Sequence, residues 1–315
     1  MYRYKKAVNF CIFIIILFLA FDPSHNPFQF SSQEYPASDV AKQNDSLLEE
    51  IKNKRADYHE EPDNAYIDEV WKKTPGRNGL EVNVQKSYEK MKEIGEFDPS
   101  LLVYDQVSPT VTLKDLPAAP IYRGHPEKQM VALLINVSWG AEHIPDILNI
   151  LNENNVKATF FIEGKWTREN AELVKMIDEQ GHLIGNHGYN HPDMARISEQ
   201  EVIRQITQTN EILEAVIDKK PLWFAPPSGS YNDQAVRAAH QLNMQTILWT
   251  VDTIDWKNPA VSVMINRVND QVHPGATILM HPTPAIVEGL SPLIKTVKDK
   301  GYKLGTIEKL LSEER

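Results

Sequence analysis

Two histidines, His187 and His191, lie four residues apart in the segment GNHGYNHP. Two imidazole nitrogens at this spacing can reach one divalent cation, and zinc readily accepts such ligands. The pair is a weak signal by itself, because solvated or structural histidines occur at this spacing equally often. A site at these histidines therefore needs supporting groups from other parts of the chain.

The chain from Met130 onward alternates short apolar runs with amphipathic segments. This order predicts an α/β fold with a parallel sheet wrapped by helices, either open or closed into a barrel. The carboxyl ends of such strands gather at one rim, where α/β enzymes carry catalytic groups. The apolar runs cover residues 131–137, 158–162, 183–185, 222–224, 246–251 and 276–280. The polar segments at the predicted rim read NVSWG, GNHGYNHP, FAPPSGSYN, VDTIDW and LMHP.

In this order, the five rim segments resemble the five motifs of the polysaccharide deacetylase family, the NodB-homology domain of carbohydrate esterases. The resemblance covers residues 130–315 and is closest in ATFFIEG and GHLIGNHGYNHPDM. The segments VWKKTPGRNGLEV and LPAAPIYRGHPEK resemble the sporulation-associated YlxY-type branch. The resemblance implies a distorted (β/α) barrel, with its site at the carboxyl rim, that acts on N-acetylated polysaccharide.

The resemblance also implies roles for individual residues. His187 and His191 correspond to two of the three ligands of a divalent metal, with zinc as the first candidate, and the family's metal polarises the acetamide carbonyl. His281 resembles the acid that protonates the leaving amine, and Asp255 resembles the carboxylate that orients it. The corresponding substrate-groove residues are Pro226, Gly229 and Trp256. Asp252 matches the first Asp of its motif, where a structural or a catalytic role remains open.

Three positions depart from the family pattern. The first motif of the family reads approximately TFDDG, in which the first Asp is the general base and the second is the third metal ligand. Ser138 and Trp139 occupy these positions, and Ala225 replaces the Arg that pairs with the base. Because an Arg without its carboxylate partner would cost about 3 to 5 kcal/mol in a buried site, losing the base and the Arg together can be nearly neutral. The base side of the site is therefore missing as a unit.

Other residues could replace the missing groups. Glu142 and His143 follow Gly140, and Glu163 lies in ATFFIEG, although the favoured interpretation of all three is as charges of exposed loops or helix starts. Trp139 has two interpretations, as a platform that stacks on a sugar ring or as apolar bulk that fills the empty ligand position.

Three hypotheses for function follow. The first and preferred hypothesis is that the protein is a catalytically impaired or inactive homologue that binds N-acetylated cell-wall or spore glycan. Such a homologue would hold a divalent metal weakly or not at all. The alternative is an active metal-dependent N-deacetylase with a rebuilt base, since loss of a general base lowers rates by about 10² to 10⁴. A third interpretation is an exported assembly protein without a ligand. Metal content and acetate release would separate these hypotheses.

Composition excludes some partners. The 315 residues carry a net charge of −10, which argues against a nucleic-acid partner because such binding depends on clustered Lys and Arg. Cys11 is the only cysteine, so an intrachain disulfide is impossible.

The sequence of the N-terminal segment indicates that the protein is exported. Arg3, Lys5 and Lys6 precede an apolar stretch, so residues 1–21 are predicted to be a signal peptide or an uncleaved membrane anchor of an extracytoplasmic protein, in a spore envelope or elsewhere. The further predicted parts are a flexible acidic linker (22–63), a small α+β unit with a Pro-rich hinge (64–127), and the deacetylase-like domain (128–315).

Overall fold

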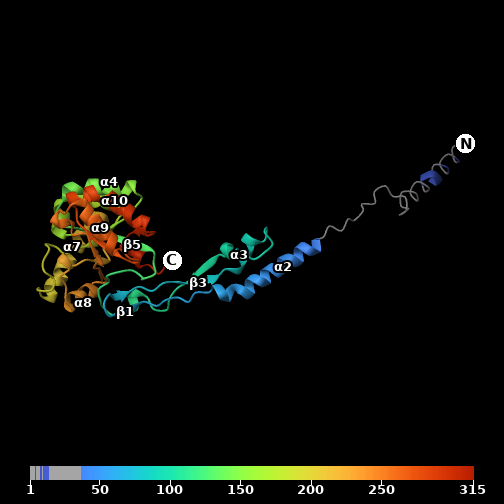
Figure 1. Ribbon diagram of the computed structural model, residues 1–315, viewed down its shortest axis with the longest axis horizontal. Coiled ribbons are helices and arrows are strands. Elements are labelled where there is room, and N and C mark those ends of the chain that lie inside the picture. The colour runs from blue at the N-terminus through green and yellow to red at the C-terminus, as the bar shows by residue number, and fades with distance from the viewer. Residues whose placement is uncertain (1–3, 5–7, 9, 14–36) are drawn as a thin grey trace. The chain divides into compact units, whose positions relative to one another are not determined.

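The computed structural model describes residues 4, 8, 10–13 and 37–315 (Figure 1). The predicted signal peptide or anchor therefore lies largely outside the described residues. Within the described part of the chain, no helix is long and apolar enough to cross a membrane. The described residues divide into two compact units, one containing those up to residue 55 together with 83–103 and the other containing residues 56–82 and 104–315.

The smaller unit contains two helices in contact, α2 (Ala37–Lys54) and α3 (Val84–Met91). Leu47 and Ile51 of α2, one helical turn apart, are buried, and so is Met91 of α3. Asn83 caps α3, because its side chain accepts a hydrogen bond from the Lys86 N–H. The predicted flexible linker is wrong for residues 37–54, since this segment is helical and two of its apolar side chains are buried.

The larger unit is built around a curled parallel sheet of eight strands. The strands on its main path have the order β10-β11-β5-β6-β7-β8-β9, and β12 pairs with the start of β5. Their bounds are β5 (Met130–Val137), β6 (Thr159–Ile162), β7 (Leu183–Asn186), β8 (Trp223–Phe224), β9 (Gln245–Thr246), β10 (Val251–Asp252), β11 (Thr277–Met280) and β12 (Lys303–Gly305). The distorted (β/α) barrel is confirmed. The apolar run 246–251, however, forms two short strands and not one.

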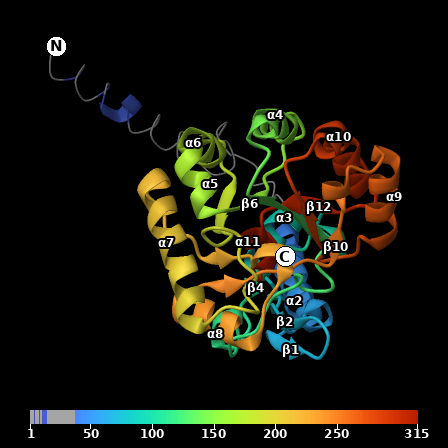
Figure 2. The same cartoon turned by 90° about the vertical axis from the view of Figure 1, so that its left-hand side faces the viewer.

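Helices surround the outside of this sheet, as Figure 2 shows in a view toward the barrel. Their bounds are α4 (Ile144–Glu153), α5 (Gly164–Glu169), α6 (Ala171–Glu179), α7 (Glu199–Ile217), α8 (Asp233–Gln241), α9 (Val261–Gln271) and α10 (Pro284–Asp299). The short helix α11 (Ile307–Leu311) instead packs with Ala132 and Leu134 on the other face of β5. Each of these helices packs its apolar face against the strands. Because the strands are parallel, their carboxyl ends and the polar residues that follow them meet at one rim.

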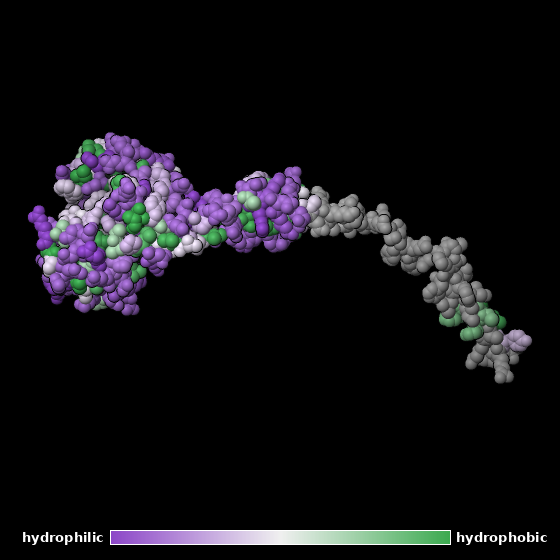
Figure 3. Space-filling view, turned by 90° about the horizontal axis from the view of Figure 1, so that it is seen from below, coloured by the Kyte–Doolittle hydropathy of each residue, from purple (hydrophilic) through white to green (hydrophobic). Residues whose placement is uncertain are grey.

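Two buried clusters follow from the alternation of side chains along β5. Leu133, Ile135 and Val137 pack in the cluster shared with the surrounding helices, while Ala132 and Leu134 pack in the inner cluster. Because successive side chains point to opposite faces of a strand, the next inward positions are 136 and 138. On the face drawn in Figure 3, hydrophilic side chains predominate and hydrophobic ones form small separate groups.

A strap made of residues 56–82 and 104–127 belongs to the same unit as the barrel. It contains two antiparallel pairs, one of β1 (Tyr66–Asp68) with β2 (Lys72–Thr74) and one of β3 (Gly79–Val82) with β4 (Tyr104–Val107). Ile121, which is fully buried, donates its N–H to the Thr246 carbonyl at 2.8 Å and accepts the Leu248 N–H at 2.8 Å. The predicted boundary at residue 128 therefore differs from the structure, because the Pro-rich segment extends the barrel sheet.

His182, just before β7, is buried and structurally constrained. The Ala158 N–H donates to its Nδ1 at 3.1 Å, and its ring meets Phe160 edge to face at 5.3 Å between centroids. Burial lowers the pKa of His182 to about 4, and the charge of Lys157 lowers it further. The imidazole is therefore neutral near pH 7.

This burial predicts acid sensitivity. Between its ordinary pKa of 6.5 and the folded value of about 4, His182 takes up a proton only in the unfolded chain, so stability falls as the pH falls through this range. We expect the wild type to lose on the order of 2 kcal/mol more than His182→Asn, whose side-chain oxygen can still accept the Ala158 N–H. Urea unfolding at several pH values measures the difference. Parallel curves for the two proteins would contradict it.

Candidate functional site

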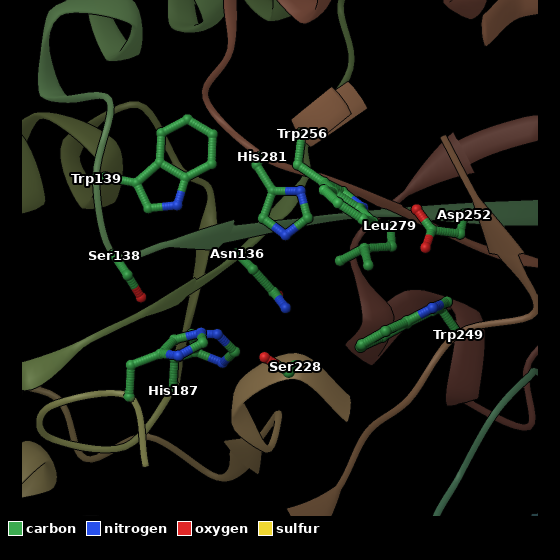
Figure 4. A pocket seen from close by; sticks show the side chains of 11 residues that line it. Asn136, Ser138, Trp139, His187, Ser228, Trp249, Asp252, Trp256, Leu279 and His281 are labelled. Atoms are coloured by element: carbon green, nitrogen blue, oxygen red, sulfur yellow. The ribbon is translucent and has the colours of Figure 1, made fainter. Parts of the chain in front are cut away.

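A pocket of about 420 Å³ opens at the carboxyl rim of the barrel (Figure 4). Its lining comes from the ends of several strands, as expected for an α/β site. The lining residues are Asn136, Ser138, Trp139, His187, His191, Ser228, Trp249, Asp252, Trp256, Leu279 and His281. Seven of the residues singled out by sequence are thus brought together, namely Ser138, Trp139, His187, His191, Asp252, Trp256 and His281.

The two predicted metal ligands lie side by side. His187 follows β7 and is fully buried, and its ring centroid is 5.4 Å from that of His191. The Nδ1 of His187 lies 2.8 Å from the Ala225 carbonyl, which can only accept, so Nδ1 carries the proton and Nε2 keeps a free lone pair. Burial, followed by the neighbouring His191, lowers the pKa of His187 to about 3. The ring is therefore neutral, which is the form that binds metals.

The set of donors is nevertheless incomplete for a resident metal ion. Among the described residues, no group of three or more His, Cys, Asp and Glu side chains is placed to hold a metal. Zinc sites in proteins usually have at least three protein ligands, and the two imidazoles supply only two. The residues present do not fit the metal that the family uses, and we derive no catalytic step through one.

Trp139, at the predicted position of the missing ligand, lines the pocket beside His281. Its side chain is 46% exposed and lies nearly parallel to His281, with a ring distance of 6.0 Å and an interplanar angle of 10°. Gly140, directly after it, has a φ of +73°, and a Cβ there would lie 2.2 Å from the Pro282 carbonyl oxygen. Only glycine fits this turn, which fixes where Trp139 leaves the strand.

The Asp255–His281 pair is intact. Asp255 is fully buried at the start of a short 3₁₀ turn, Asp255–Lys257, and its Oδ1 lies 3.1 Å from His281 Nδ1. Its carboxylate also accepts hydrogen bonds from the His281 backbone N–H at 3.1 Å and from the hydroxyls of Thr253 and Thr283 at 2.7 and 3.0 Å. This arrangement orients the His281 ring toward the pocket, where it could exchange a proton with a bound molecule.

None of the three suggested replacement groups lines the pocket. Glu142 is exposed and lies 3.7 Å from His143, outside the lining. Glu163 lies beside Ser138 and is 7% exposed, and burial raises the pKa of its carboxyl while the Ser138 hydroxyl opposes the rise. These three residues therefore supply no rebuilt base within the pocket, and Asp252 is the one carboxylate in its lining.

The predicted groove residues are only partly in place. Trp256 lines the pocket and is 53% exposed, whereas Pro226 and Gly229 are not part of the lining. Gly229 acts indirectly, because a Cβ at this position would lie 2.8 Å from the ring of Trp249. Ala225, at a replaced family position, is buried in the inner cluster and touches the site through its carbonyl.

Sequence reasoning missed Asn136, Trp249, Ser228 and Leu279, and it gave Asp252 no definite place in the pocket. Asn136 could have been found, because it lies two residues before Ser138 on the same face of β5. Trp249 had no such signal, since it lies where the strand predicted for 246–251 is interrupted.

The larger unit is thus a parallel (β/α) barrel that carries two adjacent histidines and an Asp–His pair at its rim. A family model described as polysaccharide deacetylase matches residues 123–247. The uncharacterized protein YlxY of Bacillus subtilis strain 168 is 48% identical over 315 residues, covering 99% of each chain. The peptidoglycan-N-acetylglucosamine deacetylase of Bacillus cereus is 35% identical over 201 residues, or 62% of this chain and 73% of that relative.

Solved structures agree with this similarity. Wild-type BA3943, described as a CE4 family pseudoenzyme from Bacillus anthracis, superimposes with a TM-score of 0.81 at 49% identity, covering 85% of this chain and 96% of that one. A BA3943 mutant described as a pseudoenzyme with restored enzymatic activity gives a TM-score of 0.81 at 48% identity, covering 85% and 99%. The chain belongs to the polysaccharide deacetylase family.

Proposed function

We propose that this protein is a catalytically impaired polysaccharide deacetylase homologue that binds N-acetylated cell-wall glycan in the rim pocket. The observation that carries the proposal is the presence of Ser138 and Trp139 at the base and ligand positions, with none of Glu142, His143 and Glu163 in the pocket lining. The similarity of the chain to a protein described as a pseudoenzyme supports impaired catalysis, and its similarity to a peptidoglycan deacetylase supports glycan binding.

The exposure of Trp139 favours a sugar platform over a plug. A side chain that filled a vacated ligand position would be buried, whereas Trp139 is 46% exposed beside a pocket that also contains Trp249 and Trp256. Aromatic faces of this kind stack on the apolar faces of sugar rings. The signal peptide or anchor in residues 1–21 would place this pocket outside the cytoplasm, where cell-wall and spore glycans occur.

Trp139 is the residue that tests the proposal. We expect N-acetylglucosamine oligomers to change the tryptophan fluorescence of the wild type in a saturable way, and we expect Trp139→Ala to weaken binding about tenfold or more through loss of stacking. Because Trp139 is exposed, the free energy of unfolding should change by less than about 1 kcal/mol.

Leu222→Ala provides a matched control, since Leu222 is a similarly exposed apolar residue outside the rim pocket. It should leave oligomer binding unchanged. Unchanged binding by Trp139→Ala together with a large loss of stability would support the plug and refute the platform. Failure of the wild type to bind any oligomer would refute glycan binding.

A further inference from the structure

The rim pocket contains a carboxylate that no described side chain neutralises. Asp252, at the end of β10, points into the pocket beside Trp249 and Trp256 (Figure 4). Its Oδ1 accepts the Ile254 N–H at 2.8 Å, while Oδ2 accepts no hydrogen bond from the described residues. Asp252 also forms no ion pair within the described part of the chain. A half-buried carboxylate with a free oxygen is therefore available to a ligand.

The rest of the lining favours a ligand with positive charge. It contains no Lys or Arg, and it includes the indole rings of Trp139, Trp249 and Trp256, whose faces attract cations. His281 is held 3.1 Å from the buried carboxylate of Asp255, so this pair has no net positive charge whether or not the ring is protonated. The net charge of −10 on the whole chain also raises the local concentration of cations.

One of these indole rings already has a cation beside it. The Nζ of Lys257, a residue outside the lining, lies 4.8 Å from the centroid of the Trp256 ring. Trp256 is 53% exposed, so a ligand can also reach it. The contact shows that an ammonium group is compatible with this ring, although the charge of Lys257 opposes a second one. Removing this charge should therefore favour a cationic ligand.

We propose that the rim pocket prefers glycan whose sugars carry free amino groups, with the ammonium of one such sugar paired with Asp252 beside Trp249 and Trp256. The inference rests on the proposed function, because it names the form of the glycan that the same site binds. A neutral acetamide leaves the Asp252 carboxylate unpaired, whereas an ammonium neutralises it and donates to its free oxygen.

A glycan chain can use both sides of the pocket. Trp139 lies across the pocket from Asp252 in Figure 4, so a stacked sugar and the paired amino group can belong to different units of one chain. Sugars with free amino groups are the product of N-deacetylation. The protein would therefore bind glycan after a deacetylase has acted on it.

Tetramers of equal length separate the two forms of the glycan. The full chain is titrated at low salt with the glucosamine tetramer and with the N-acetylglucosamine tetramer, and calorimetry measures both affinities. At about pH 7, an amino group with the usual α-amino pKa of about 7.7 to 8.0 is mostly protonated, whereas an imidazole with the usual pKa of about 6.5 is mostly neutral. We expect the glucosamine tetramer to bind about tenfold tighter.

Variants assign this preference to Asp252. Asp252→Asn keeps an acceptor for the Ile254 N–H but removes the charge, and we expect the ratio of the two affinities to fall below about twofold. Glu142→Gln is the matched control, because it removes one negative charge from an exposed residue outside the lining and should leave the ratio unchanged. Lys257→Met should strengthen binding of the glucosamine tetramer about threefold, which tests the proposal even if Asp252→Asn does not fold.

The outcomes separate this inference from the proposed function. Equal or tighter binding of the N-acetylglucosamine tetramer would overturn the inference and leave the proposed function intact. Binding of neither tetramer would overturn both. Spermidine, a cation without sugar rings, is the third probe. If it binds as tightly as the glucosamine tetramer, or if Asp252→Asn keeps the preference, the pocket does not recognise an amino sugar through Asp252.

Discussion

The triple variant Ser138→Asp, Trp139→Asp, Ala225→Arg is expected to bind one zinc ion per chain and to release acetate from N-acetylglucosamine oligomers. The two new carboxylates would restore the general base and the third metal ligand that the family pattern places at these positions. Both positions line the pocket that contains His187 and His191. Replacing a general base typically changes rates by about 10² to 10⁴, so acetate release should exceed that of the wild type by at least this factor.

The matched control is Ser138→Asn, Trp139→Asn, Ala225→Arg, which has similar volumes but lacks the carboxylates. It should release no more acetate than the wild type. His187→Ala in the active variant should remove the zinc and the activity together. If the triple variant folds and binds zinc but releases no acetate, then the losses at these three positions do not explain the missing activity. Substantial acetate release by the wild type would contradict the proposed function itself.

Asp255→Ala is expected to destabilise the protein by about 3 to 5 kcal/mol. The buried carboxylate accepts four hydrogen bonds, two from His281 and one each from Thr253 and Thr283. The His281 and Thr283 donors would lose this acceptor, whereas the Thr253 hydroxyl would keep the Leu279 carbonyl at 2.9 Å. Chemical denaturation measures the loss. This would explain why the Asp–His pair remains in a site without its base, since Asp255 also supports the rim.

Asp252→Ala is the control for a carboxylate of the same loop. Asp252 is only partly buried, and its Oδ1 accepts a single hydrogen bond from the Ile254 N–H at 2.8 Å. We expect a loss below about 1.5 kcal/mol. Similar losses for the two variants, or a loss below about 1 kcal/mol for Asp255→Ala, would show that the rim does not depend on the Asp255 hydrogen bonds.

The fold of residues 130–315 could be predicted because strands and helices alternate with clear apolar runs. The short strands were harder to predict from the sequence. Run 246–251 is interrupted because Leu248 bonds to Ile121 of the strap, a contact between distant residues that no local pattern reveals. Helix α2 was missed because its polar composition resembles that of a linker, although Leu47 and Ile51 are buried.

Site residues could be predicted where they belong to a sequence motif. They could not be predicted where the local backbone conformation determines whether a side chain reaches the pocket. The positions of His187, His191, Asp255 and His281 follow from the motif order. Pro226 and Gly229 lie outside the pocket lining, on either side of Ser228, whose φ of +54° no motif indicates. Ile254, before Asp255, also has a φ of +54°, a conformation that is strained for a β-branched residue and is not indicated by its sequence.

The strap changes where the motif-bearing domain can be cut. An expression fragment that starts at residue 128 would contain every family motif but would lose Ile121, and with it the backbone partner of Thr246 and Leu248. It would also uncover inner-cluster side chains that Ala65 and Leu113 now help to cover. A bare strand edge beside exposed apolar surface is a template for pairing between chains, so such a fragment would be expected to self-associate. The smallest unit that folds therefore begins well before the first motif that identifies the family.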